Sequence, residues 1–140
     1  CSSDLKKIFP DPVWKRRYKH VLDFESMLAE EGTVIIKLFL NISKEEQKKR
    51  LESRLQDPDK LWKFCMDDLD DRNRWDEFQT AYQDLIEKTS TPEAPWYIIP
   101  ADRKWYRNLV VARLMVEKLR HLQLSLPTPN FDPASIIIPD

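Results

Sequence analysis

The chain has 140 residues, enough for one ordinary domain with a moderate hydrophobic core. Its 23 basic and 24 acidic residues nearly cancel, so no overall field attracts nucleic acid or a membrane, and an anion site must come from local clustering. Gly32 is the single glycine of the sequence, which excludes a glycine-rich loop that wraps a phosphate group.

The cysteine content and the hydropathy indicate the compartment. Two cysteines, Cys1 and Cys65, do not form a disulfide framework, and no stretch is long and apolar enough to cross a membrane. The first residues do not follow the pattern of a signal peptide, and we interpret the start of the sequence as an arbitrary cut or the edge of an ordered region. We therefore expect a reduced, cytoplasmic setting.

The first expected element is a helix from about residue 11 to residue 30. Asp11 is a good N-cap and Pro12 a good first helical residue. Gly32 can serve as the left-handed residue that ends the helix. Apolar side chains recur at helical spacing at Trp14, Tyr18, Val21 and Leu28.

Residues 33–40 are almost continuously apolar, which is typical of a parallel strand covered on both faces. Lys37 interrupts this stretch, and burying a lysine amine is costly unless it reaches water or a counter-charge. Two interpretations stay open. Lys37 either reaches solvent from an edge strand or is held close to a phosphate group.

A strongly basic helix follows the strand. Ser43 and Glu46 fit a capping box at its start, and Asp57-Pro58 ends it. Arg50 and Arg54 lie one turn apart on the same side. The other cations of this strip are Lys44, Lys48, Lys49, Lys60 and Lys63.

A long helix is expected from Asp67 onward. Its first turns carry four aspartates, at positions 67, 68, 70 and 71, a pattern more typical of capping and matching of the helix dipole than of a metal site. An apolar stripe then recurs at Trp75, Phe78, Tyr82 and Leu85. We interpret this stripe as core and not as an aromatic platform for a nucleotide.

The remaining elements complete an α/β pattern. Residues 89–95 are expected to form a loop, residues 96–100 a second buried strand, and Asp102 the cap of a last helix. Two strands joined through a long helical connection predict a parallel pair. The last helix has apolar residues at Trp105, Leu109, Ala112, Val116 and Leu119, and residues 125–140 form an extended tail with four prolines.

Three segments carry a resemblance to a known family. They are LFLNISKEEQKKRLESRLQDPDKLWKF, Trp14 to Tyr18 with Phe24-Glu25, and Ala94 to Asp102. Over about residues 12 to 124 the chain resembles the C-terminal half of the polyphosphate kinase 2 family. The resemblance implies a P-loop-kinase-like doubly wound parallel sheet with a helical lid at about residues 44–75, and places residues 1–124 in part of one such domain.

The resemblance also implies a reaction. The family moves phosphate between inorganic polyphosphate and a nucleoside mono- or diphosphate, with ADP/ATP or AMP as the nucleotide and GDP as a further candidate. The family's glycine loop and its Asp-Arg magnesium motif should lie before residue 1. We therefore expect Mg²⁺ to be held mainly by a preceding half, the segment alone to be inactive, and the enzyme to be a homo-oligomer.

Site residues follow from the match to the family pattern. It implies that Arg54 and Arg50 stabilise charge on phosphate, and that Lys37 and Lys63 position polyphosphate or the nucleotide phosphates. Arg74, or Arg72 beside it, adds to this from the second lid helix unless it pairs with a nearby aspartate within the helix.

Two alternative functions stay open. One is a catalytically inactive pairing or regulatory domain that keeps the lid but lacks the phosphate loop. The less favoured one is a nucleic-acid-binding module, because the cationic strip is short and the aromatic residues lie on core stripes. The isolated chain is also expected to be unstable or oligomeric, or to be held by other chain segments, since a two-stranded sheet exposes an apolar edge.

Overall fold

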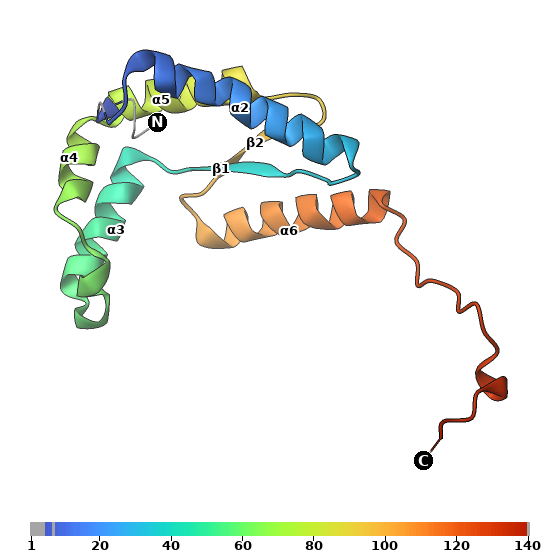
Figure 1. Cartoon of the computed structure of the whole chain (residues 1–140). Helices are drawn as coiled ribbons and strands as arrows, with labels where there is room; N and C mark the ends of the chain where they lie inside the picture. Colours follow the sequence, from blue (N-terminus) through green and yellow to red (C-terminus); the bar gives the residue numbers. More distant parts are fainter. Residues whose placement is uncertain (1–4, 7, 140) are drawn as a thin grey trace.

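A computed structural model describes residues 5, 6 and 8–139. It has an α/β arrangement in which the described residues form a two-stranded sheet with helices on both of its faces (Figure 1). Helices α2 (Asp11–Glu30) and α5 (Trp75–Thr89) lie together over one face. Helix α6 (Lys104–His121) lies along the other face. The predicted α/β class is confirmed.

The sheet consists of β1 (Lys37–Asn41) and β2 (Trp96–Pro100), which pair in parallel as predicted. The predicted start of the first strand at residue 33 is wrong. Lys37 pairs with Trp96, and the residue before Trp96 is Pro95, which has no N–H to donate to a ladder. Pairing therefore begins only at Lys37.

The expectation that the first strand is covered on both faces is also wrong. Leu40 remains 47% exposed, and Ile98 on the neighbouring strand is 58% exposed. The small buried core is made instead by residues of α3 (Lys44–Gln56), of α5, and of β2 with the segments on either side of it. Its apolar members are Leu51, Ala81, Ala94, Ile99 and Ala101.

Helix α2 has the predicted bounds, but its N-cap residue differs from the predicted one. Pro10 occupies the N-cap position, so Asp11 is the first helical residue and not the cap. The Asp11 carboxylate instead accepts hydrogen bonds from Trp14 Nε1 at 3.3 Å and Lys15 Nζ at 3.2 Å. Gly32 has φ = 83°, the left-handed conformation predicted for the end of this helix.

An arm leaves the carboxyl end of β1 (Figure 1). It comprises α3 (Lys44–Gln56), the 3-10 helix η1 (Pro58–Lys63) and α4 (Asp67–Asn73). The predicted break at Asp57-Pro58 is confirmed, and the Asp57 side chain accepts a hydrogen bond from the N–H of Asp59 at the start of η1.

The single long helix expected from Asp67 is divided in two. Arg74 lies between α4 and α5 with φ = −99° and ψ = 26°, and its N–H donates to Asp71 O, three residues back. No glycine or proline marks this break, which is why the helical periodicity alone did not predict it.

Cys65, just before α4, is exposed and forms no disulfide, and Cys1 lies outside the described residues.

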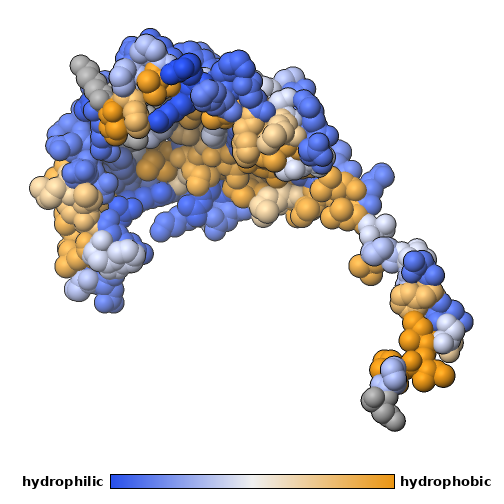
Figure 2. Space-filling view, in the orientation of Figure 1, coloured by the Kyte–Doolittle hydropathy of each residue, from blue (hydrophilic) through white to orange (hydrophobic). Residues whose placement is uncertain are grey.

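Helix α6 exposes the apolar side chains that the sequence singled out. Trp105, Leu109, Val116 and Leu119 are all exposed, whereas Val110, Val111 and Leu114 are half-buried. The chain then runs away from the body, interrupted by η2 (Pro133–Ser135) (Figure 1). Figure 2 shows apolar side chains on the body between the helices and again near the outer end of this tail.

Candidate functional site

A pocket of about 410 Å³ lies at the carboxyl end of β1. Its walls come from the end of β1, from α3 and α4 in the arm, and from α5. Ligands of open parallel sheets bind beyond the carboxyl ends of the strands, because the loops that follow the strands gather there. This position makes the pocket the leading candidate for the site.

Arg54 is the most available cation on the pocket wall. Its Nη1 atom lies 3.6 Å from Asp68 Oδ2, and the Arg54 side chain is 38% exposed. This separation is too long for a hydrogen bond, so the guanidinium keeps donors for a second anion. Among the five sequence-predicted site residues, Arg54 and Arg50 line this pocket, and the other three do not.

Arg50 also lines the pocket, but its donors are engaged. Its Nε atom donates to Glu46 Oε1 at 2.8 Å, and Nη2 donates to Ala101 O at 2.7 Å and to Asp102 O at 3.4 Å.

Of the two hydrogen bonds of the predicted capping box, one is formed. Ser43 Oγ accepts from the N–H of Glu46 at 3.1 Å, but the Glu46 carboxylate binds Arg50.

Aromatic residues of α5 also line the pocket. Trp75, Phe78 and Tyr82 line the pocket, and the Tyr82 ring centroid lies 5.1 Å from that of Phe39 and 6.1 Å from that of Phe78. These residues are half-buried rather than fully enclosed. Sequence reasoning identified the stripe but missed its place at the pocket. The missing signal was that α5 crosses the end of β1, which only the fold reveals.

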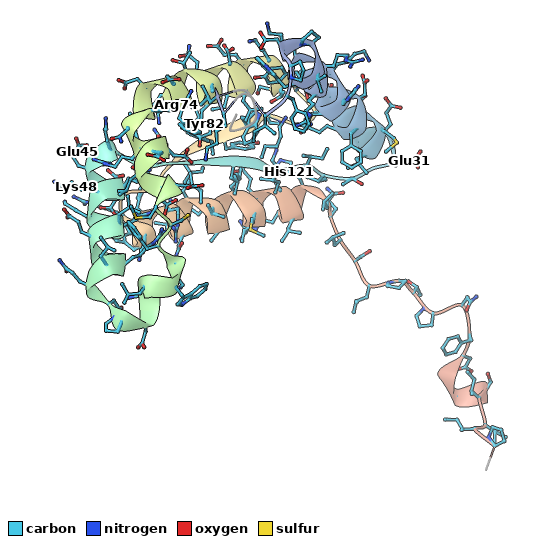
Figure 3. All side chains as sticks on the ribbon, turned by 60° about the vertical axis from the view of Figure 1, so that its left-hand side comes forward. Glu31, Glu45, Lys48, Arg74, Tyr82 and His121 are labelled. Atoms are coloured by element: carbon cyan, nitrogen blue, oxygen red, sulfur yellow. The ribbon has the colours of Figure 1, made fainter. Side chains whose placement is uncertain are left out.

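Burial raises the pKa of the Tyr82 phenol, and the negative charge of Asp71 raises it further. The hydroxyl therefore stays protonated at neutral pH and can donate a hydrogen bond. Figure 3 shows Tyr82 on the side of α5 that faces the strands, whereas Glu45 and Lys48 lie on the outer side of α3.

The acidic residues at the pocket are paired with cations. Asp68 faces Arg54, and Asp71 accepts an ion pair from Lys6 Nζ at 2.9 Å, which raises the pKa of Lys6. Across residues 5, 6 and 8–139, no group of three or more His, Cys, Asp or Glu side chains is arranged to hold a metal ion. Asp67, Asp68 and Asp70 occupy the first turn of α4, where negative charge favours the helix dipole.

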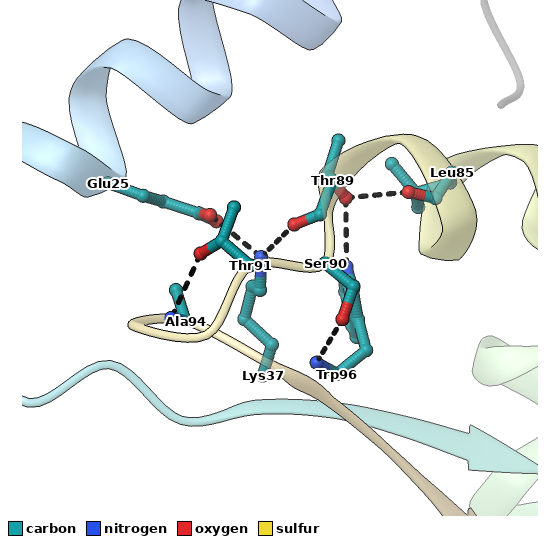
Figure 4. Close-up of polar contacts among 8 residues, drawn as sticks. All are labelled: Glu25, Lys37, Leu85, Thr89, Ser90, Thr91, Ala94 and Trp96. Carbon is teal, nitrogen blue, oxygen red and sulfur yellow. Dashed lines mark hydrogen bonds and ion pairs between the residues drawn. The ribbon is translucent and has the colours of Figure 1, made fainter.

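Lys37 lies away from the pocket, beneath α2 and α5 (Figure 4). Its residue is 8% exposed, and Nζ donates to Glu25 Oε2 at 2.7 Å and to the carbonyl oxygen of Thr89. The amine also lies 5.3 Å from the centre of the Trp96 ring. It neither reaches solvent nor faces the pocket, because a carboxylate and a helix-terminal carbonyl satisfy it inside the protein.

Lys63 and Arg74 also lie outside the pocket lining. Lys63 is exposed on η1, with Nζ 5.0 Å from the centre of the Trp62 ring. Arg74 donates from Nη2 to Glu77 Oε2 at 2.6 Å, which lowers the pKa of Glu77 and raises that of Arg74. The partner of Arg74 is thus a glutamate of α5 and not an aspartate.

Arg72 ties the two sides of the arm together. Its Nη1 atom donates to Lys44 O at 2.7 Å and to Gln47 Oε1 at 2.9 Å. Arg72 therefore joins α4 to the first turns of α3.

Within the described part of the chain, no helix has the length and apolar character that a membrane crossing needs.

Comparisons with known proteins agree with the fold and with the quoted segments. The polyphosphate kinase 2 family model matches residues 5–126. An AMP/ADP-polyphosphate phosphotransferase of Meiothermus ruber is 50% identical over 134 residues, covering 96% of this chain and 50% of the relative. An ADP-polyphosphate phosphotransferase of Rhodopseudomonas palustris is 39% identical over 119 residues, covering 85% of this chain and 41% of the relative.

A solved structure supports the same assignment. Polyphosphate kinase 2 from Arthrobacter aurescens superimposes with a TM-score of 0.84 at 49% identity, over 89% of this chain and 45% of that chain. This chain thus spans about half the length of these relatives. With a match to the family model over most of its residues, the chain belongs to the polyphosphate kinase 2 family.

Proposed function

We propose that this chain is part of a phosphotransferase that moves phosphate between inorganic polyphosphate and a nucleoside mono- or diphosphate. In this proposal residues 1–124 belong to one kinase-like domain and the arm, within about residues 44–75, is its lid. The observation that carries the proposal is the pocket at the carboxyl end of β1, which the loosely paired Arg54 lines together with aromatic residues of α5.

The printed names of the relatives support the choice of substrates. They are phosphotransferases of AMP/ADP or ADP with polyphosphate. The matched regions cover 96% and 85% of this chain. We therefore favour AMP or ADP as the acceptor, and keep GDP as a test substrate.

The chemistry assigned to the pocket is electrostatic. A transferring phosphoryl group spreads negative charge over its oxygens, and a guanidinium fork can donate two parallel hydrogen bonds to them. In this proposal Arg54 supplies such a fork from the lid once its weak pairing with Asp68 is exchanged for phosphate. The wall formed by Trp75, Phe78 and Tyr82 would exclude water on the other side, which strengthens these interactions.

The described residues do not fit a magnesium site, because Asp68 and Asp71 face cations and no larger acidic group lies at the pocket. They also include no glycine loop, since Gly32 lies at the end of α2. We therefore derive no step through magnesium and propose that other parts of a longer enzyme supply it. The prediction that residues 1–140 alone show no turnover follows from the same reasoning.

The experiment uses a fusion in which this chain replaces the matching half of the Meiothermus ruber relative. Purified fusion is given Mg²⁺ and polyphosphate with AMP, ADP or GDP, and nucleotide products are separated and quantified. We expect polyphosphate-dependent phosphorylation of AMP or ADP. A folded fusion without transfer to any nucleotide contradicts the proposal and favours an inactive regulatory domain.

Substitutions in the fusion place the chemistry. Arg54→Ala should lower kcat and kcat/KM together by about 10²-fold or more, as for a lost stabiliser of the transition state. Arg54→Lys should recover only part, because a point charge does not reproduce the fork. Lys48→Ala is the matched control, since Lys48 lies on the outer side of the same helix (Figure 3) and pairs with Glu52 at 3.8 Å.

A further inference from the structure

The geometry points to Arg50 and Asp102 as positioning residues that fix α3 on the end of β2 and thereby set the place of Arg54. This inference deepens the proposed function and rests on its assignment of Arg54 to the phosphate. It gives Arg50 a different role from the direct stabilisation of phosphate that the family pattern implies.

The first support is the way in which α3 begins. The backbone N–H of Ser43, just before α3, donates to Asp102 Oδ1 at 2.7 Å. Asp102 lies in the loop after β2, so a side chain from that loop satisfies the Ser43 N–H, which the Glu46 carboxylate would accept in a complete capping box. The expected role of Asp102 as cap of α6 is wrong, because the N-cap position of α6 is Arg103.

The second support comes from Arg50, whose side chain also binds the loop after β2. We call the contacts between the first turns of α3 and this loop the junction. Its guanidinium reaches back to Glu46 within α3 and across to the carbonyl oxygens of Ala101 and Asp102. The N–H of Ala101 in turn donates to Asn41 O at 2.7 Å, at the end of β1. Ala101 is 1% exposed, so this ring of hydrogen bonds lies against the buried part of the protein.

Electrostatics agree with this arrangement. The hydrogen bond from the Ser43 N–H lowers the pKa of Asp102, and the positive charges of Arg50 and Lys49 lower it further. Asp102 therefore stays ionised at neutral pH, where a charged acceptor holds the Ser43 N–H most strongly.

The junction acts on Arg54 through the length of α3. Arg54 lies eleven residues beyond Ser43, roughly 16 Å along the helix axis, so a tilt of about 10° at the junction moves its backbone by about 3 Å. A displacement of about 1 Å can already cost a large factor in rate when a group must meet reacting atoms. A fixed junction is therefore needed for Arg54 to reach the phosphate in one geometry.

A double-mutant cycle in the fusion enzyme separates positioning from direct contact. Arg50→Met and Asp102→Leu should each lower kcat about 10-fold, with the KM for nucleotide changed by no more than about 3-fold. In the Arg54→Ala background each should lower kcat by less than about 2-fold, because there is no guanidinium left to position. Asp102→Asn keeps an acceptor oxygen and should lose less than Asp102→Leu.

The alternatives give different results. If the losses in kcat from Arg50→Met and Arg54→Ala multiply in the double variant, Arg50 contacts phosphate itself and the positioning role is overturned. If Arg54→Ala leaves turnover unchanged, the proposed role of Arg54 fails and this inference falls with it. Arg50→Lys serves as a second, milder variant if Arg50→Met does not fold.

Amide hydrogen exchange reads the junction without activity. In Asp102→Leu the Ser43 amide should exchange at least about 10-fold faster than in the unsubstituted enzyme, because it loses its acceptor. Amides of α5 should keep their rates, and Asp102→Asn should stay close to the unsubstituted protein. An unchanged exchange rate of the Ser43 amide in Asp102→Leu contradicts the proposed junction, whatever the kinetics show.

Discussion

Lys37 and Arg54 belong to the same strand-to-helix stretch, and their positive charges meet different surroundings. Lys37 is almost fully buried and is bound by Glu25 and the carbonyl of Thr89. The Arg54 side chain is 38% exposed, and its Nη1 atom lies 3.6 Å from Oδ2 of Asp68. The difference shows that partners from other elements decide whether a cation serves the fold or remains available to a ligand.

The Lys37 region joins three elements of the fold. Glu25 comes from α2, Thr89 ends α5 and Lys37 opens β1, so the ammonium holds two helices to the sheet (Figure 4). The Arg54 region instead bridges two segments of the arm, α3 and α4. The following predictions test this contrast, from the largest expected change to the smallest.

Lys37→Ala should lower the free energy of unfolding by about 3 kcal/mol, because it leaves the half-buried Glu25 carboxylate without its partner. Thermal or denaturant unfolding of the fusion measures this. The matched double variant Lys37→Met with Glu25→Leu removes both charges and should recover most of the loss. A negligible effect of Lys37→Ala would show that Glu25 finds water, and would weaken the structural role.

Thr89→Val should cost about 1 kcal/mol, because the substitution keeps the shape and removes a hydrogen-bond partner. Thr89 is fully buried, and its Oγ1 donates to Leu85 O and accepts from Trp96 Nε1 at 2.9 Å. The exposed Ser90, which accepts from the N–H of Trp96 at 3.2 Å, offers the control Ser90→Ala with a smaller cost. Equal costs would show that burial does not matter at this loop.

Lys63→Ala should raise the KM for polyphosphate by about 2- to 5-fold and leave kcat unchanged, as for a charge that binds ground state and transition state alike. Lys63 is exposed on η1, and within residues 5, 6 and 8–139 its amine forms no ion pair with a carboxylate, so its charge is open to a polyanion at the outer end of the arm. The effect should shrink at high salt. A fall in kcat instead would place Lys63 at the reacting phosphate.

The smallest expected effect is the acid response of Asp102. Because its folded pKa is lowered, its charge stabilises the fold above its unfolded pKa, near 3.9, and that contribution is lost as pH falls through the folded pKa. The Tm difference between the unsubstituted fusion and Asp102→Asn should thus be constant above about pH 5 and should decrease toward zero at lower pH. A gap that persists at the lowest pH would contradict a role for the Asp102 charge.

Local sequence signals predicted much of the fold. The bounds of α2 and β2, the break at Asp57-Pro58 and the left-handed Gly32 follow from periodicity, proline and glycine, which act within a few residues. The start of β1 does not, because it depends on where the partner strand begins. The end of α4 at Arg74 has no sequence marker of this kind.

The candidate site was predictable only in part. The pair Arg50 and Arg54 on one side of α3 was expected, and both line the pocket. That Arg50 is bound to Ala101 and Asp102 depends on a contact between residues far apart in sequence, which spacing cannot supply. The same holds for Glu25 beside Lys37, and for the aromatic stripe of α5, whose pattern shows an inner face but not what that face meets.

Steady-state kinetics of two variants of the fusion test the central claim most directly. The account predicts that Arg54→Ala loses about 10²-fold in kcat/KM with an unchanged Tm. It predicts that Lys37→Met with Glu25→Leu stays within about 3-fold of the unsubstituted rate, because those charges serve the fold and not the phosphate. Near-normal turnover of Arg54→Ala, or a comparable rate loss in a well-folded Lys37 double variant, would contradict it.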